Sequence, residues 1–343
     1  MAQLYSISIQ PPLSIHPPAP ITKLPILLLN IHTQCNCRCV MCDIWQREDS
    51  SELRAASLEH HRDSLISLGV QWVVLTGGEP LLNRDLPAII EFFRTLGIRI
   101  TLLSTGLLLR SKAALIAEGI NEVILSIDGP PEIHNAIRRI PRAFETIARG
   151  VETLRALNPD IPINCRTTIQ KQNHTHLRAT VAAAHSLGLN SISFLPADVS
   201  SSSFNRELQP WPTARQNEIA LTASELTALE NEIELLIEAH QSDLRTRFIA
   251  ENETKLRRIA TRFREHLEGT VPQSPRCNAP WVSTVMEVDG TLRPCFFHPP
   301  FASTTNATLE QALNSQLAQA FRSQLDVSSN PTCQRCVCSL NYR

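Results

Sequence analysis

The 343-residue sequence lacks the marks of several broad classes of protein. Its 32 basic and 33 acidic residues nearly cancel and no long basic run occurs, which argues against a nucleic-acid partner. The longest apolar stretch near the start, Pro25 to Asn30, is far too short to cross a bilayer. The first residues do not combine a basic segment with a long apolar run, as a secretory signal would. We therefore expect a cytoplasmic protein with no membrane span.

Cysteine, by contrast, is abundant and clustered. Of ten cysteines, four lie between Cys35 and Cys42 and five between Cys277 and Cys338, while Cys165 stands alone. Disulfides would be the ordinary interpretation in a secreted protein, but clustered cysteines in a reducing compartment more often bind metal. Cys165 lies in an apolar run and is expected to be a small core residue.

From Leu24 to about Pro196, apolar runs alternate with amphipathic stretches. The apolar runs are 24–31, 72–76, 98–104, 122–127, 163–169 and 191–195. The helical patterns between them are 57–68, 85–96, 112–118, 142–157 and 174–187. Continuous apolar strands that alternate with helices indicate a parallel α/β sheet, open or closed into a barrel, with helices outside.

Polar and glycine residues follow the first four predicted strands. The first strand leads into the cysteines after residue 34, and the others into 76–80, 104–106 and 126–129. In parallel sheets the functional residues gather at the carboxyl ends of the strands, so these segments are expected to share one site.

We divide the chain into four segments. They are an extended arm (1–22), a core barrel (23–197), a loop and helical bridge (198–273) and a cysteine-rich module (274–343). The bridge should hold two long helices, 222–239 and 244–268. In the module we expect a hairpin, 283–288 with 291–296 around Asp289-Gly290, and a helix over 309–325.

Cys35, Cys39 and Cys42 have C-x3-C-x2-C spacing. Three thiolates on one tight loop can hold three corners of a [4Fe–4S] cluster and leave one iron open. Zinc is the alternative, but it usually takes four protein ligands from paired C-x2-C units.

This loop resembles the signature loop of the radical S-adenosylmethionine superfamily, and Thr33 and Asn36 fit the same pattern. Cys37, which we interpret as a non-ligand, and Met41, where an aromatic residue is commoner, depart from it. The resemblance implies a partial (β/α)6 TIM-like barrel and an open iron that chelates S-adenosylmethionine. It also implies reductive cleavage of that cofactor to a 5′-deoxyadenosyl radical and a flavodoxin- or ferredoxin-like reductant.

Further residues resemble the family's cofactor contacts. Gly77, Gly78, Glu79 and Pro80 resemble the element that binds the cofactor's amino group, although a simple Gly-Gly turn is the alternative. The resemblance also places Ser104, Ser126 and Asp128 near the ribose and Arg166 at the carboxylate. A turn-forming Asp-Gly and a surface arginine stay open as alternatives.

Four other side chains near these positions receive weaker assignments. Phe194 and Leu195 are expected to be core residues or to border the adenine. His134 and Arg138 are expected to be structural.

The second cysteine cluster contains Cys277, then Gly290-x4-Cys295, Cys333-x2-Cys336 and Cys338. Four thiolates suit zinc or an iron–sulfur cluster equally. This region resembles the twitch module, the shortened relative of the SPASM domain. The resemblance implies one auxiliary [4Fe–4S] cluster on Cys277, Cys295, Cys333 and Cys336, with Cys338 as a spare or alternative ligand, and zinc stays open.

The sequence thus predicts a radical S-adenosylmethionine enzyme, of oxidoreductase or transferase type, that abstracts hydrogen from an unidentified substrate. Oxidation through the auxiliary cluster is one outcome. A small molecule is favoured over a ribosomally made peptide because little chain precedes Leu24 to bind a leader. No catalytic side chain is identified. A non-catalytic iron–sulfur carrier and a zinc-stabilised binding protein are the rivals, and the Gly-Gly-Glu-Pro element argues against the carrier.

Overall fold

The computed structural model describes residues 20–201, 203 and 211–342. Nearly all of the predicted N-terminal arm therefore lies outside the described residues, as does part of the loop predicted after residue 198. None of the helices in the described part of the chain is long and apolar enough to span a membrane.

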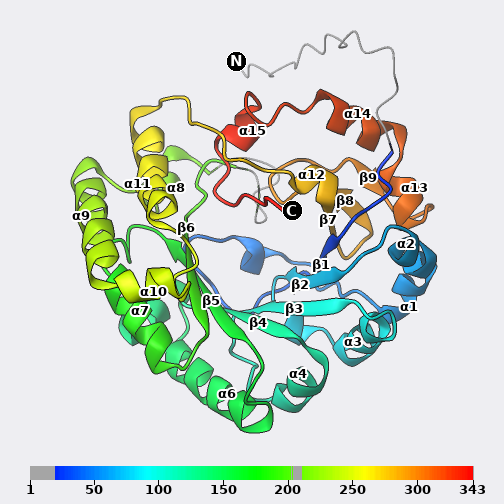
Figure 1. Cartoon of the computed structure of the whole chain (residues 1–343), viewed down its shortest axis with the longest axis horizontal. Helices are drawn as coiled ribbons and strands as arrows, with labels where there is room; N and C mark the ends of the chain where they lie inside the picture. The colour runs from blue at the N-terminus through cyan, green and yellow to red at the C-terminus, as the bar shows by residue number, and fades with distance from the viewer. Residues whose placement is uncertain (1–19, 202, 204–210, 343) are drawn as a thin grey trace.

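Six parallel strands form the core of the molecule, as the apolar runs predict. They are β1 (Ile26–His32), β2 (Trp72–Gly77), β3 (Arg99–Ser104), β4 (Glu122–Ser126), β5 (Ile163–Ile169) and β6 (Ser191–Pro196). Each pairs with the next in chain order, which gives the curved sheet of a partial (β/α)6 barrel (Figure 1).

Helices cover the convex side of this sheet (Figure 1). They are α1 (Ala55–Leu58), α2 (Arg62–Ser67), α3 (Leu86–Thr95), α4 (Ala113–Gly119), α6 (Ala143–Leu157) and α7 (Leu177–Ser186). The helix α5 (Pro131–Arg138) instead packs against the cysteine loop, where the Val40 N–H donates to the Ile137 carbonyl at 3.0 Å. Short 3-10 turns are η1 (Ile44–Gln46), η2 (Glu59–His61) and η3 (Pro80–Leu82). The helix predicted over 57–68 is broken by η2, and α5 was not predicted.

Alternate strand residues face opposite sides of the sheet. One set, including Leu29, Leu75 and Leu102, is fully buried in the main hydrophobic core with the helices. Cys165 belongs to the same core, which confirms its predicted role. The other set, including Thr76 and Arg166, lines cavities on the concave side.

The helical bridge contains α8 (Thr213–Asn217), α9 (Ala223–Ala239), α10 (Gln241–Arg245) and α11 (Glu253–Glu268). The prediction of one helix over 244–268 is wrong, because Arg247 takes a left-handed φ of 61° and ends the helical path. The chain then runs beside β6, where the Ile192 N–H donates to the Phe248 carbonyl at 2.7 Å. Burial of Ile249 against the sheet offsets the lost helical hydrogen bonds.

The C-terminal region extends the barrel sheet to nine strands, in the order β6-β5-β4-β3-β2-β1-β7-β8-β9. Its elements are α12 (Ala279–Val282), β7 (Ser283–Met286), β8 (Thr291–Arg293), β9 (Ala302–Ser303), α13 (Leu309–Leu313), α14 (Gln316–Gln324) and α15 (Pro331–Gln334). The predicted hairpin is confirmed as antiparallel β7 and β8. The helix predicted over 309–325 is instead two helices, because the Ser315 side chain caps a new start at α14. The last residues run across the concave side of the barrel (Figure 1).

Candidate functional site

Cys35, Cys39 and Cys42 line one cavity at the carboxyl ends of the barrel strands. We call it the rim cavity. Its lining also includes Met41, Gly77, Gly78, Ser104, Ser126, Arg138, Arg166 and Leu195. The predicted gathering of strand ends around one site is therefore what the fold produces.

The fourth cysteine of the loop is placed differently. Cys37 is 2% exposed and does not line the rim cavity. Its thiol is hydrogen-bonded to Cys35 and Cys39, and these bonds together with burial raise its pKa. The hydrogen bond from Cys37, followed by the charge of Arg138, lowers the pKa of the Cys39 thiol to about 6 in spite of burial. Cys35, Cys39 and Cys42 thus line the rim cavity, whereas Cys37 is buried outside its lining.

Gly77 and Gly78 bring the end of β2 against the cysteine loop. A Cβ on Gly78 would lie 2.1 Å from the Gln34 carbonyl oxygen, and one on Gly77 would lie 2.5 Å from that of His32. The backbone N–H groups of Gly78 and Glu79 donate to these two carbonyls, both at 2.8 Å. Glycine is therefore required here by the approach of two backbones.

We predict that Gly78→Ala displaces this loop. The clash is with backbone, so the variant should unfold with about 1–3 kcal/mol less stability and bind less iron at the rim cavity. Thermal unfolding and iron content measure both effects. Gly97→Ala is the matched control, because its φ is +67° but nothing lies within 4 Å, so it should lose only about 1 kcal/mol. Equal iron loss in both variants would contradict the prediction.

Glu79 is fully buried and does not line the rim cavity. Its Oε1 accepts from the Leu81 N–H at 3.0 Å and the Ser104 hydroxyl at 2.9 Å. Its Oε2 accepts from the N–H and hydroxyl of Thr105, both at 2.7 Å. Burial raises the pKa of Glu79, and these hydrogen bonds oppose that rise. These four donors fix the carboxylate, which ties the ends of β2 and β3 together. The role of the Gly-Gly-Glu-Pro element at the cofactor's amino group stays a prediction.

Pro80 and Ser104, which were also predicted to contact the cofactor, take part in the local structure around Glu79. Pro80 is buried and begins η3, whose N-cap is Glu79. The Ser104 hydroxyl, besides its bond to Glu79, accepts from the Gly106 N–H at 3.0 Å. Ser104 still lines the rim cavity, whereas Pro80 does not.

Asp128 is likewise fully buried. Its Oδ2 accepts from the Arg138 Nε at 2.6 Å and Nη2 at 2.5 Å, and its Oδ1 accepts from the Thr168 N–H at 3.0 Å. Asp128 does not line the rim cavity, and its ribose contact stays a prediction. Its partner Arg138 reaches that cavity, with Nη1 3.4 Å from the Cys39 Sγ. His134 is buried and accepts from the Asp128 N–H at 3.2 Å, in keeping with a structural role.

Ser126 and Arg166 are register partners on β4 and β5 and both line the rim cavity. The Arg166 Nε lies 3.4 Å from the Ser193 hydroxyl, and among the described residues this guanidinium has no ion-pair partner. Leu195 lines the same cavity, whereas Phe194 is 3% exposed and belongs to the core.

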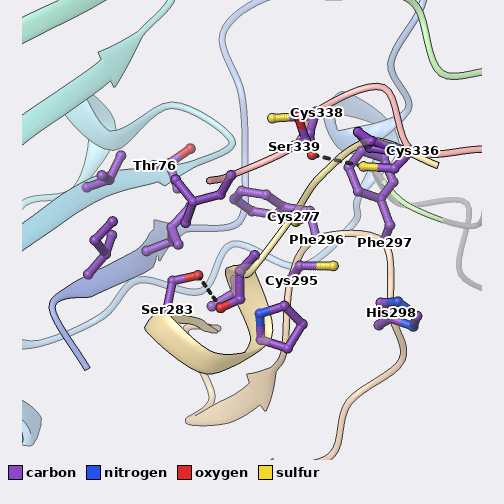
Figure 2. A pocket seen from close by; sticks show the side chains of 18 of the residues that line it. Thr76, Cys277, Ser283, Cys295, Phe296, Phe297, His298, Cys336, Cys338 and Ser339 are labelled. Atoms are coloured by element: carbon purple, nitrogen blue, oxygen red, sulfur yellow. Dashed lines mark hydrogen bonds between the residues drawn. The ribbon is translucent and has the colours of Figure 1, made fainter. Parts of the chain in front are cut away.

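A second cavity, the thiol cavity, is lined by the five C-terminal cysteines, Cys277, Cys295, Cys333, Cys336 and Cys338. Figure 2 shows four of them around the cavity, with His298 nearby. Burial raises the pKa of Cys295 to about 11 and that of Cys333 to about 12. The Cys336 thiol donates to the Cys338 carbonyl at 2.9 Å. All five cysteines thus line one cavity, although the described residues contain no group of three or more His, Cys, Asp or Glu side chains placed to hold a single metal ion, so the auxiliary ligand set stays a prediction.

His298 was missed by sequence reasoning, although Cys295-x2-His298 has the spacing of a ligand pair. It is 5% exposed, and its Nε2 lies 3.3 Å from the Cys333 Sγ. Burial lowers the pKa of His298 to about 4. The imidazole packs edge-on against Phe321, with ring centroids 5.1 Å apart.

A third cavity, which we call the middle cavity, adjoins both of these cavities. It is lined by Thr76, Gly77, Arg166 and Thr168 of the barrel and by Glu287, Arg293, Phe296, Phe297 and Cys338 of the C-terminal region. Glu287 accepts from the Asn30 Nδ2 at 2.6 Å and from the Arg293 Nε at 3.1 Å. No sequence motif pointed to these three side chains, which the pairing of β1 with β7 brings together.

Comparisons with known proteins agree with this geometry. Residues 29–184 match the family model of the radical SAM superfamily, and residues 277–337 match SPASM, an iron-sulfur cluster-binding domain. An AdoMet-dependent heme synthase from Methanosarcina barkeri is 33% identical over 159 residues, which is 45% of each chain. A probable GTP 3',8-cyclase from Pyrobaculum aerophilum is 28% identical over 191 residues, 53% of this chain and 62% of that one. The match to the heme synthase spans less than half of its length.

Solved structures match over more of the chain. Native anSMEcpe with bound AdoMet and the Cp18Cys peptide aligns with a TM-score of 0.63 at 19% identity, over 86% of this chain and 81% of that one. This likeness establishes the fold. The three thiols of the rim cavity also suit the [4Fe–4S] cluster that a radical SAM domain binds with S-adenosylmethionine. The chain therefore contains a radical SAM domain over residues 29–184 and a C-terminal SPASM iron–sulfur region over residues 277–337, and it shares its fold with anSMEcpe.

Proposed function

We propose that the enzyme cleaves S-adenosylmethionine reductively at the rim cavity and abstracts hydrogen from a substrate held in the middle cavity. The observation that carries this proposal is the lining of the rim cavity, where Cys35, Cys39 and Cys42 meet Ser126 and Arg166. When bound, the cluster supplies one electron and S-adenosylmethionine supplies the 5′-deoxyadenosyl radical.

In this proposal, residues of the chain hold the cluster and orient S-adenosylmethionine. Cys35, Cys39 and Cys42 would hold three irons as thiolates, which leaves the fourth iron for the cofactor. Arg166 would hold the cofactor's carboxylate, since a guanidinium fork without an ion-pair partner faces that cavity. The backbone of Gly77 and Gly78 would meet the amino group, with Glu79 fixing the strand end behind it.

Ser126 lines the rim cavity beside Arg166, and we assign the ribose to this hydroxyl. Ser104 is a weaker ribose contact, because its hydroxyl already serves Glu79 and Gly106. Leu195 would border the adenine.

The middle cavity supports a small-molecule substrate. It adjoins the rim and thiol cavities, because Arg166 lines all three and Cys338 lines both the middle and thiol cavities. Its lining carries several polar and charged side chains, and three of them are already ordered, since Asn30 and Arg293 both bind Glu287. Two phenylalanines on the C-terminal side supply apolar surface for the substrate.

Cys277, Cys295, Cys333 and Cys336 would hold an auxiliary [4Fe–4S] cluster, with Cys338 as the alternative fourth ligand. Ligation by four thiolates leaves no open iron, which favours electron transfer over substrate binding. A cluster beside the middle cavity is suitably placed to accept an electron from a substrate radical, which would make the net reaction an oxidation.

The proposal is tested with enzyme that is reconstituted and assayed without oxygen. We expect the reconstituted enzyme to hold about eight irons and to form 5′-deoxyadenosine from S-adenosylmethionine once reduced. Iron without cleavage, from a cluster shown by electron paramagnetic resonance to be reduced, would favour a non-catalytic carrier. Zinc in both cysteine sets would favour a binding protein, and zinc in the thiol cavity alone would exclude the electron-transfer role. Tight binding of a candidate leader peptide would favour a peptide substrate.

His298 offers a separate prediction. An N–H donor to a cluster thiolate stabilises the reduced cluster, so His298→Leu should lower the auxiliary reduction potential with the iron content unchanged. His298→Gln keeps a donor and should restore part of the shift. Redox titration followed by electron paramagnetic resonance measures both potentials. Identical potentials in the wild type and the leucine variant would remove His298 from this role.

A further inference from the structure

His32 is the last residue of β1 and lines the middle cavity, but the proposed function gives it no role. It is 6% exposed, so its imidazole is almost out of contact with bulk solvent. The register between β1 and β2 shifts after Asn30, so that Ile31 and His32 together lie opposite the single residue Gly77. Ile31 packs in the main core, whereas His32 lines the cavity. Bulges of this kind are over-represented beside active sites, where they redirect a side chain.

One hydrogen bond fixes where the proton lies on the His32 ring. The Gln34 N–H donates to the His32 Nδ1 at 3.0 Å. A ring nitrogen that accepts a hydrogen bond carries no proton, so the imidazole is neutral and its single proton lies on Nε2. Within the described part of the chain, Nε2 has no hydrogen-bond partner. The ring thus offers the middle cavity an N–H donor whose position is fixed.

Asn30, two residues earlier on β1, supplies an acceptor to the same cavity. Its Nδ2 donates to Glu287, but its Oδ1 is buried and has no hydrogen-bond partner among the residues that the structure describes. A buried polar atom without a partner destabilises the folded chain, so most such atoms in proteins are paired. A bound molecule that gave a donor to Asn30 and an acceptor to His32 would satisfy both side chains.

The charged side chains that line the middle cavity are already matched. Glu287 pairs with Arg293 at 3.1 Å, and Arg47 pairs with Asp49 at 2.8 Å. Arg166 is assigned to the cofactor's carboxylate in the proposed function. Once the cofactor is bound, the described lining therefore keeps no unpaired charge for a charged substrate, and burying an unpaired charge is unfavourable.

We propose that His32 and Asn30 select an uncharged, hydroxyl-bearing substrate, which accepts from the His32 Nε2–H and donates to the Asn30 Oδ1. An apolar part of the same molecule packs against Phe296 and Phe297, which line the cavity as well. This inference rests on the proposed function, because the middle cavity must be the substrate site. A carboxylate fits less well, because it brings no donor to Asn30 and adds negative charge beside Glu287.

The test measures the binding of two probes to reconstituted enzyme that holds S-adenosylmethionine but no reductant. The probes are 3-phenylpropane-1,2-diol and 3-phenylpropanoate, which carries a carboxylate in place of the diol. Isothermal titration calorimetry should show tighter binding of the diol by the wild type. His32→Asn keeps an acceptor for the Gln34 N–H but loses the Nε2–H donor, so it should bind the diol about tenfold more weakly. His32→Gln places an amide N–H near the lost donor and should recover part of the affinity.

His61→Asn is the matched control, because His61 is also 6% exposed but does not line the middle cavity, so this variant should keep the wild-type affinity for the diol. The proposal is overturned if the wild type does not bind the diol, binds the carboxylate more tightly, or binds the diol no better than His32→Asn does. Equal loss of affinity in His32→Asn and His32→Gln, or loss of iron from either, would make His32 a structural residue and overturn it as well. A wild-type enzyme that binds the diol as expected but forms no 5′-deoxyadenosine once reduced would instead refute the proposed function.

Discussion

Changing Cys35, Cys39 and Cys42 together to alanine should abolish 5′-deoxyadenosine formation and leave a folded chain. The three thiols line the rim cavity, so their loss removes every cysteine ligand that we assign to the first cluster. The thiol cavity lies beyond the middle cavity and has its own five cysteines, so its cluster should persist. Iron should therefore fall from about eight to about four per chain. Iron analysis and quantification of 5′-deoxyadenosine check the two parts separately.

Cys37→Ala is the matched control for this prediction. Cys37 lies within the same loop but is 2% exposed and does not line the rim cavity. We expect it to keep both clusters and to cleave S-adenosylmethionine. Loss of half the iron in Cys37→Ala, or cleavage by the triple variant, would contradict our assignment of ligands. Retention of eight irons by the triple variant would do the same.

Local sequence patterns were sufficient to predict the strands of the barrel and the grouping of the cysteines. The predicted strands at 72–76 and 163–169 correspond closely to β2 and β5, because the residues that face the core are largely apolar. Cys35, Cys39 and Cys42 share a tight loop, so their spacing alone limits how far apart they lie. The same applies to Cys333 and Cys336.

The direction of individual side chains could not be predicted in this way. Glu79 and Asp128 each follow a strand at the correct rim, yet both point into the protein, where backbone and side-chain donors bind them. A motif fixes the position of a residue along the chain but not its χ angles at a turn. The hydrogen-bond partners of Glu79 and Asp128, Thr105 and Arg138, belong to other elements of the fold. The motifs around Glu79 and Asp128 therefore gave no information about them.

Long-range pairing explains the rest of what sequence reasoning missed. Asn30 and Glu287 are 257 residues apart and meet only because β7 joins the barrel sheet beside β1. A further cavity, lined by Cys35 and Arg139 among others, likewise combines the cysteine loop with the turn after α5. Neither contact leaves a periodic or spaced signal in a single sequence, so only the folded structure shows these two cavities.

The buried pair of Asp128 and Arg138 leads to the second large expected effect. Arg138→Met should destabilise the enzyme by about 3–5 kcal/mol, because it leaves the fully buried Asp128 carboxylate without its counter-charge. Thermal and urea unfolding measure this loss. Arg139→Ala, next along the chain but exposed, should stay within about 1 kcal/mol of the wild type.

A double variant separates the role of charge from the role of position. Arg138→Met with Asp128→Asn removes both charges, so it should recover most of the stability that the single change loses. It does not restore the Arg138 contact to the Cys39 thiol at 3.4 Å, so iron binding at the rim cavity should remain impaired. If the double variant is as unstable as Arg138→Met, the buried charge is not the cause. If it recovers both stability and iron, Arg138 acts on the cluster only through Asp128 and the fold around it.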